Sequence, residues 1–424
     1  MISQLPFLIL FSLLFVFIAW REIDWAVYVV IILLPTYLIR FSNNIFPFTL
    51  LEVMMILLFL VWLSKKWIKK QPIHLANWPL LIIWLLAATI AVIFSPDQQA
   101  GLGLLKAYFI EPVIFYLVFI NVIKEKKQLK LAAWSLGLLV AWLSVYAIIQ
   151  YFTGVGIPDP WQAAESRRVV AVFPYPNALG LLLAPILALF IGLAARVKFF
   201  TKRTFWWGVM IIMLGSFSLL AAVSQGAWLG LALALVFLSF FLFSWKKVLS
   251  FWLIIIILIL AIPQARDYLM PLATFSDVSG DVRKVMWQGT WNLLKARPVL
   301  GSGLAGFPYY YEQYRLIKHT EFLLYPHNII LNFWVELGLL GLIIFVWLLV
   351  WFFRRGYQLL KTKNIEFNWV IALMTAMVCL IGHGLVDVPY FKNDLAVLFW
   401  LLLAMMTVVK NWQKGSLQNR KNAL

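Results

Sequence analysis

The chain has 424 residues, of which 64% are hydrophobic and 12% are charged, and its formal net charge is +18. Soluble domains are about 45–50% apolar and about 25% charged, so this composition excludes a soluble globular protein and indicates a polytopic helical membrane protein. Nucleic-acid binding is not expected despite the positive charge, because the basic residues form short clusters at the ends of apolar runs and not one basic patch.

Apolar runs in chain order predict twelve or thirteen transmembrane helices, depending on whether the first two short runs form one broken helix or cross separately. None of them alternates like a barrel strand, so we expect an all-α fold and a single integral membrane domain over residues 1–424. The runs lie near residues 5–20, 24–40, 48–63, 78–94, 102–123, 129–152, 176–195, 205–223, 226–243, 247–262, 328–353, 368–388 and 394–409.

The basic clusters predict how these helices are oriented. By the positive-inside rule, the side of the membrane on which the clusters lie is the cytoplasm. The opposite side then receives the longest insertion, residues 263–327, which faces the periplasm or the outside of a single-membrane cell. The clusters lie at residues 64–70, 124–130, 196–203, 246–247, 354–363 and from 410 onward.

The long external loop, residues 263–327, is the part best suited to chemistry, because it gathers polar, basic and aromatic residues between apolar segments. Residues 281–296 have the spacing of an amphipathic helix that lies on the outer membrane interface or dips into it. Arg297-Pro298 ends this helix, since a residue before proline is pushed out of the α region.

Several side chains of this loop suit a transfer reaction. His327 stands where the loop re-enters the membrane and can take a proton from an attacking hydroxyl, although a helix cap or a headgroup contact is the alternative. Arg283 can grip a diphosphate with its guanidinium fork, or extend to lipid phosphates. Gly301 and Gly303 can form an anion-binding nest or simply a turn. Tyr310 belongs to an aromatic run that can stack on sugar rings, but an aromatic belt at the membrane surface is the favoured interpretation.

Other ionisable residues lie outside this loop. Lys106 and Glu111 fall within one apolar run, where ionisable groups are costly and are therefore functional candidates. Arg167 and Arg168 precede Asn177 in a second external loop, where they can bind a lipid-linked anion or simply remain exposed to water.

His383 and Asp387 are four residues apart and are expected to share one helix face. A pair of metal ligands and a proton relay are two alternative interpretations of these residues. We favour a hydrogen-bonded structural pair and expect no metal site, since no third ligand is apparent. The external loops also lack an Asp-x-Asp motif. If the protein transfers a glycosyl group, a metal-bound nucleotide sugar is therefore not the expected donor.

The order of these motifs resembles the O-antigen ligase and polymerase superfamily of bacterial integral membrane glycosyltransferases. The resemblance covers roughly residues 95–405 and is specific as an ordered set, although each motif alone is weak. The matching parts are FPYPNALG (173–180), SQGAWLGLALAL (224–235), Arg283…Trp291…Arg297-Pro298…Gly301-Ser302-Gly303…Phe307, Pro326-His327-Asn328…Glu336-Leu337-Gly338…Gly341-Leu342, and His383…Asp387.

The resemblance implies transfer of a glycan from an undecaprenyl-diphosphate carrier to an acceptor hydroxyl, at the outer face of the bacterial cytoplasmic (inner) membrane. The acceptor would be the lipid A core or a growing polysaccharide. Arg283 would contact the diphosphate and His327 would be the base, in an inverting displacement that needs neither a metal nor a cofactor. Asn328 is expected to bind substrate, and the supporting residues expected are Glu111, Asn177, Glu336, His383 and Asp387.

The chain departs from the family pattern at Gln225. The family often has Ser-Arg-Gly with an important arginine, whereas residues 224–226 here read Ser-Gln-Gly. A neutral amide can hydrogen-bond a diphosphate but cannot neutralise it. Either Arg167, Arg168 or Lys106 supplies the missing charge, or the substrate differs, or the activity has been lost.

The same motifs leave other functions open. An O-antigen or exopolysaccharide polymerase and a protein O-oligosaccharyltransferase share the pattern and differ in whether the acceptor is a glycan, a lipid or a protein. A lipid or polysaccharide transporter is a different class, disfavoured because ionisable residues are sparse at mid-membrane and no inverted repeat is visible. The departure at Gln225 also leaves open a non-catalytic subunit of an envelope assembly.

Overall fold

The computed structural model describes residues 5–42, 47–195, 201–316, 318, 324–361 and 367–421. These residues are mostly helical, and two short strands, β1 (Arg40–Ser42) and β2 (Pro47–Thr49), pair antiparallel. The helices are α1 (Leu5–Arg21), α2 (Ile23–Ile32), η1 (Leu34–Leu38), α3 (Leu50–Ile68), α4 (Trp78–Ile93), α5 (Gln98–Leu104), η2 (Leu105–Ile110), α6 (Glu111–Val122), α7 (Lys126–Thr153), η3 (Ala164–Ser166), α8 (Pro176–Ala194), α9 (Lys202–Ala221), α10 (Gln225–Leu242), α11 (Trp245–Ala261), α12 (Pro263–Thr274), α13 (Val278–Ala296), α14 (Phe307–Tyr311), α15 (Ile329–Leu360), α16 (Phe367–Gly384) and α17 (Asn393–Lys421).

Eight helices of the described ranges are long and apolar enough to cross a membrane, or nine if the bent pair that begins with α11 counts as one span. Among the other apolar runs, α1, α2 and α4 are shorter, and α3 contains Glu52, Lys65 and Lys66. The polytopic all-α fold is therefore confirmed. The sequence predicts twelve or thirteen crossings, which is more than the eight or nine spans that the length and composition of the described helices support. That higher number stays a prediction.

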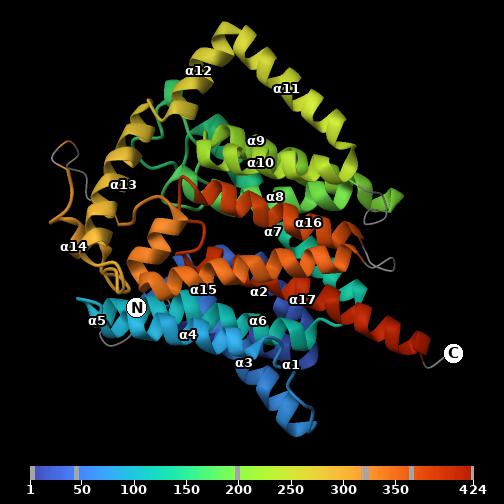
Figure 1. The fold of residues 1–424 in the computed structure, drawn as a ribbon. Coiled ribbons are helices and arrows are strands. Elements are labelled where there is room, and N and C mark those ends of the chain that lie inside the picture. Colours follow the sequence, from blue (N-terminus) through green and yellow to red (C-terminus); the bar gives the residue numbers. More distant parts are fainter. Residues whose placement is uncertain are drawn as a thin grey trace.

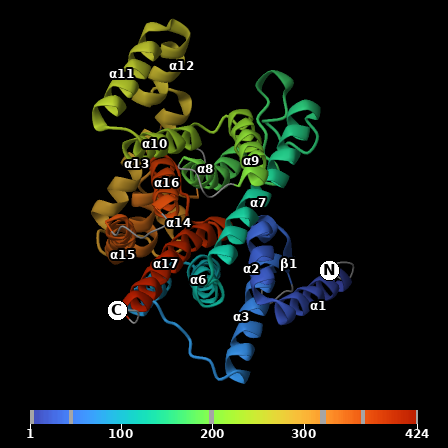
Figure 2. The same cartoon turned by 90° about the vertical axis from the view of Figure 1, so that its right-hand side faces the viewer.

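The long helices form one bundle around a central group. Helices α8, α10 and α16 pack against one another, α17 packs against α6, and α15 packs against α4 (Figure 1). Within their apolar windows, α8 and α17 are each 83% buried and α16 is 78% buried, so these three helices form the centre. Figure 2 shows α1, α2 and α3 on the opposite side of the molecule from α11 and α12.

Helices α11 and α12 stand apart from the bundle, as the apex at the top of Figure 1. Of the residues in α11 only Val248 is buried, and none is buried in α12. The chain turns by 106° between α11 and the segment from Pro263 to Ala296. Proline suits the first turn of a helix, where its missing N–H is not needed, so Pro263 begins α12 at the bend.

The amphipathic helix expected near residues 281–296 is α13. It begins slightly earlier, because the side chain of Asp277 caps it by accepting a hydrogen bond from the Gly280 amide at 3.2 Å, and it ends at Ala296 as predicted. Its apolar face is buried against protein: Met286, Leu293 and Leu294 pack with residues of α14 and α15. Its packing surface is therefore the bundle itself.

The segment between α13 and α14 is fixed to a break in α15. Gly338 has φ +68° and ψ −175°, so the helix is interrupted there and the Leu339 amide bonds to the Val299 carbonyl at 2.9 Å. One turn earlier, the Ser302 amide donates to the Val335 carbonyl at 2.7 Å. This close approach depends on Gly301, where an added Cβ would lie 2.2 Å from the Val335 oxygen.

We expect Gly301→Ala to destabilise the protein by about 1–3 kcal/mol, because it overpacks a backbone contact and forces alanine to a φ of +63°. The measurement is the thermal unfolding midpoint of the purified protein in detergent. Gly103→Ala is the matched control, since the space around that position is open. Equal midpoints for the two variants would contradict the packing role of Gly301.

Candidate active site

The backbone around His327 is held on both sides. His327 has φ +44°, in the left-handed region that residues other than glycine rarely adopt. Before it, the Trp287 indole N–H of α13 donates to the Pro326 carbonyl at 2.9 Å. After it, the side-chain oxygen of Asn328 accepts from the Ile330 and Leu331 amides at 3.0 Å each and so caps α15. The imidazole is therefore presented by a fixed turn.

His327 is oriented by Asp387. Its Nδ1 lies 3.2 Å from Oδ1 of Asp387, and the same oxygen accepts from the Val388 amide at 2.9 Å. The carboxylate favours a proton on Nδ1, which leaves the Nε2 lone pair free to accept another. The His327 side chain is 24% exposed and that of Asp387 is 2% exposed, so the imidazole is accessible and its carboxylate partner is not.

The Asp387 carboxyl is held in its charged form. Burial by itself would raise its pKa, but the charge and hydrogen bond of His327, with the Val388 amide, lower the pKa below its usual range. An ionised Asp387 can fix the imidazole tautomer at neutral pH and stabilise the imidazolium that forms when His327 accepts a proton.

The prediction of a hydrogen bond between His383 and Asp387 is wrong. Helix α16 ends at Gly384, so Asp387 lies in the following turn and does not share a helix face with His383. Asp387 pairs with His327 instead, and within the described residues Nδ1 of His383 has no hydrogen-bond partner.

A pocket of about 490 Å³ adjoins His327. The two external loops expected from the sequence, the one that holds Arg167 and Arg168 and the long one at residues 263–327, both contribute to its wall. The lining residues are Trp161, Arg168, Tyr175, Pro176, Asn177, Leu324, Tyr325 and His327.

Only one of the two adjacent arginines reaches this pocket. The Arg168 guanidinium donates to the Ala222 carbonyl at 2.9 Å and to the Asn177 side chain at 3.2 Å, so it ties the pocket to the turn before α10. Arg167 instead donates to the Tyr151 carbonyl at 2.8 Å and lies over Gly154, at the end of α7. Arg168 and Asn177 are thus brought to His327, and Arg167 is not.

Arg283 lies in a second pocket, of about 410 Å³, together with Gln225. The guanidinium Nε donates to the Val386 carbonyl at 2.9 Å. Helices α10, α12 and α13 surround the pocket, and its walls are largely apolar, with Trp228 and Leu272 among the lining residues. The position where this chain departs from the family pattern therefore shares a pocket with Arg283.

The turn between α16 and α17 contacts one residue of each pocket. Val386 lines the Arg283 pocket and bonds to Arg283, and the next residue, Asp387, pairs with His327. An imidazole and a guanidinium are thus held by consecutive residues of one short turn. This arrangement is suited to a reaction in which one group loses a proton while another gains negative charge.

Lys106 and Glu111 belong to a separate cluster. Lys106 pairs with Glu52 of α3 at 3.2 Å, across the π-helical turn η2. Glu111 is 3% exposed, and neither of its oxygens has a hydrogen-bond partner among the described residues. Because Glu52 offsets the charge of Lys106, we do not assign Lys106 as the substitute for the missing arginine.

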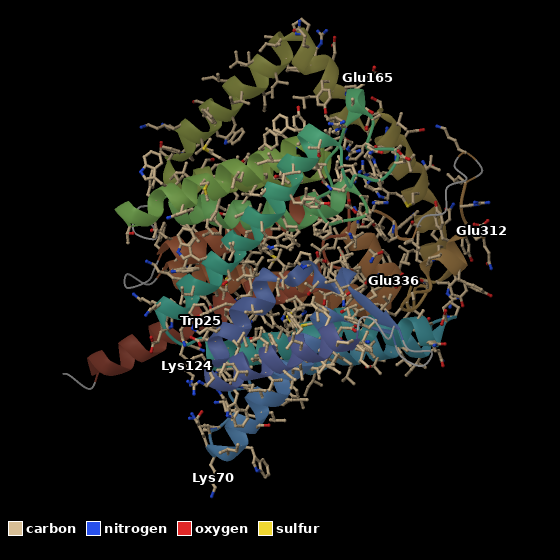
Figure 3. All side chains as sticks on the ribbon, turned by 180° about the vertical axis from the view of Figure 1, so that it is seen from behind. Trp25, Lys70, Lys124, Glu165, Glu312 and Glu336 are labelled. Carbon is tan, nitrogen blue, oxygen red and sulfur yellow. The ribbon has the colours of Figure 1, made fainter. Side chains whose placement is uncertain are left out.

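Other residues expected at the site make contacts within the long external loop, residues 263–327, or to it. Gly303 approaches the Phe94 carbonyl, and an added Cβ would lie 2.7 Å from it. Glu336, within the bundle in Figure 3, accepts from the Ala305 amide at 2.6 Å. The Arg297 guanidinium covers the Tyr310 ring at 3.8 Å. The structure does not bring these residues together with His327.

Sequence reasoning missed a group of polar aromatic residues beside His327. The Tyr325 ring lies 4.6 Å from the His327 ring, and its hydroxyl is 3.2 Å from that of Tyr175, whose ring is covered by the Lys392 ammonium at 4.2 Å. Burial, with the nearby charge of Asp387, raises the pKa of Tyr325 well above its usual value, so it stays a neutral donor. Tyr175 stands in a motif that carries the resemblance, and Tyr325 directly precedes another, which was the available signal.

Within the described ranges, His, Cys, Asp and Glu form no group of three or more that could hold a metal ion.

Comparisons with known proteins agree with the resemblance noted in the sequence. A family model described as O-antigen ligase matches residues 208–346, which include Gln225, Arg283 and His327. A Rickettsia conorii protein named "Putative polysaccharide ligase" is 27% identical over 135 residues. That match covers 30% of this chain and 32% of the relative, so the chain aligns with about a third of the relative's length. The resemblance to the O-antigen ligase superfamily is therefore confirmed, and the matching part is residues 208–346.

Proposed function

We propose that this protein is a membrane glycan transferase of the ligase type, which moves a glycan from a polyprenyl-diphosphate carrier to an acceptor hydroxyl. The observation that carries the proposal is the turn between α16 and α17, where Val386 accepts a hydrogen bond from Arg283 and Asp387 orients His327. The family match over residues 208–346 and the name of the Rickettsia relative support the same class of reaction.

The Arg283 pocket suits the donor. Its apolar walls can take the first isoprenoid units, while Arg283 and Gln225 offer N–H donors to the diphosphate. A guanidinium both bonds and neutralises phosphate oxygens, whereas the Gln225 amide only bonds them. Arg283 would therefore supply the charge in this pocket, and Gln225 would orient the ligand.

The His327 pocket suits the acceptor. Tyr175, Tyr325 and Asn177 offer hydroxyl and amide groups of the kind that bind sugars, and Arg168 lies among them. The acceptor oxygen forms a bond to the anomeric carbon, and its proton goes to Nε2 of His327. The bond from that carbon to the diphosphate breaks, and its electron pair leaves with the diphosphate, whose charge Arg283 stabilises. Attack opposite the leaving group inverts the anomeric centre.

The proposed location is the outer face of a bacterial cytoplasmic membrane, and the proposed donor is undecaprenyl-diphosphate-linked. The positive-inside distribution supports this location, because the basic clusters would lie in the cytoplasm and His327 on the opposite side. For the acceptor we propose a lipid A core or a polysaccharide hydroxyl, since the relative's name refers to polysaccharide ligation.

We expect His327→Ala to lower glycan transfer by about 10²–10⁴-fold, because general-base catalysis contributes about that much. Asp387→Asn should also lower the rate, by a smaller factor, since it removes the group that fixes the tautomer. The assay is transfer from a diphosphate-linked lipid donor to mixed acceptors in liposomes. The control is His74→Ala, an exposed histidine outside the His327 pocket. Full activity in His327→Ala would exclude the base role.

Arg283→Ala should lower transfer by about 10²-fold or more, as expected for loss of a cation that stabilises the leaving group. Gln225→Arg should strengthen donor binding, seen as a lower KM for the donor with little change in acceptor KM. The matched control is Arg266→Ala, whose exposed side chain pairs with Asp267. An unchanged donor KM in Gln225→Arg would argue against a diphosphate in this pocket.

Transfer is expected to survive EDTA, because Arg283 supplies the charge on the leaving group in the proposed reaction. The measurement compares the wild-type rate with and without chelator, and a metal-dependent glycosyltransferase treated in parallel verifies the chelation. Loss of transfer that added Mg²⁺ restores would contradict the proposed mechanism.

A further inference from the structure

A third pocket, of about 330 Å³, lies at the end of the bundle away from α14. Its residues come from α1, α2, α3, α6 and α7 and the segments between them. Figure 3 shows Lys124, one of these residues, at the left of the molecule, with Glu312 of the α14 region at the right-hand edge. This pocket is therefore separate from the two that flank the α16–α17 turn.

The pocket gathers positive charge. Five cationic side chains line it, and none of them forms an ion pair with another part of the described chain. The two acidic lining residues are Glu22 and Asp24, and the oxygens of Asp24 accept from the Trp25 amide at 3.1 Å and the Gln128 side chain at 3.5 Å. An anion would offset the mutual repulsion of the cations. The cations are Arg21, Lys65, Lys66, Lys69 and Lys124.

A buried donor in the same wall also points to an anion. Trp62 is 3% exposed, and its indole N–H has no hydrogen-bond partner in the described part of the chain. A buried indole N–H usually has a partner, and Trp62 lines the pocket, so an acceptor oxygen of a ligand would satisfy this group. Beside it, Lys66 is 9% exposed and donates to the Pro72 carbonyl at 3.1 Å, which leaves further N–H groups.

An apolar pocket of about 420 Å³ adjoins this cationic pocket and shares Lys66 and Gln71 with it. Leu63, Trp67 and Ile73 line the apolar pocket, and Trp67 is 84% exposed. A ligand with a phosphate head and a hydrocarbon tail matches both pockets together. Free phosphate matches only the first.

We propose that this paired pocket binds an anionic phospholipid, with its phosphate between the Trp62 indole N–H and the lysine ammonium groups and an acyl chain along Leu63 and Trp67. Basic pockets between helices on the cytoplasmic side are a known way of holding anionic headgroups. The basic clusters assign this end of the bundle to the cytoplasmic leaflet. The site is independent of glycan transfer.

The test is native mass spectrometry of the purified full chain titrated with phosphatidylglycerol, with phosphatidylcholine as the neutral lipid and glycerol 3-phosphate as the free phosphate. One phosphatidylglycerol should be retained more tightly than the others. Trp62→Phe, which keeps the ring and removes the N–H, should weaken its binding by about tenfold. Lys124→Ala, at an exposed position, should weaken it by about fivefold.

Lys127→Ala is the matched control, because it removes a nearby exposed lysine that does not line the pocket, and it should leave phosphatidylglycerol binding unchanged. Thermal unfolding midpoints equal to wild type would verify that each variant is folded. Equal affinities for the two lipids, or equal losses in Lys124→Ala and Lys127→Ala, would overturn the proposal. Tight glycerol 3-phosphate binding without phosphatidylglycerol binding would overturn the assignment to a lipid.

Discussion

The site depends on the turn between α16 and α17, because two consecutive residues of that turn hold the two groups suited to chemistry. The Val386 carbonyl accepts from Arg283 at 2.9 Å, and the Asp387 carboxylate lies 3.2 Å from His327. The two contacts come from different parts of the chain, since Arg283 belongs to α13 and His327 to the segment before α15. A shift of this turn would therefore change both pockets at once.

Close helix packing fixes the position of that turn. Gly226 and Gly230 of α10 face α16, and an added Cβ at Gly226 would lie 2.6 Å from the His383 ring. Small residues at such contacts let helix backbones approach, which is how membrane helices gain packing energy without a hydrophobic driving force between them. Burial of Asp387 is costly, and the partner that offsets the cost, His327, is also the proposed base. One pair thus serves both stability and the proposed chemistry.

The apolar runs predicted the helices because a bilayer leaves the backbone few other solutions, and the turn that ends α13 follows from Arg297-Pro298. The partner of Asp387 could not be predicted in the same way. Helical spacing paired it with His383, but α16 ends three residues before it, and the contact with His327 spans 60 residues of sequence. That Arg168 and not Arg167 lines the His327 pocket could not be predicted either. It depends on a hydrogen bond from Arg168 to a carbonyl at the end of α9, which is distant in the sequence.

The most direct measurement is a cryo-electron microscopy structure of the protein in a nanodisc with a non-transferable polyprenyl-diphosphate glycan analogue. We expect diphosphate oxygens about 2.7–3.2 Å from the Arg283 guanidinium, the Gln225 amide beside them, and the anomeric carbon facing Nε2 of His327. A diphosphate bound near Lys106 and Glu52, or an anomeric carbon remote from His327, would contradict the central claim.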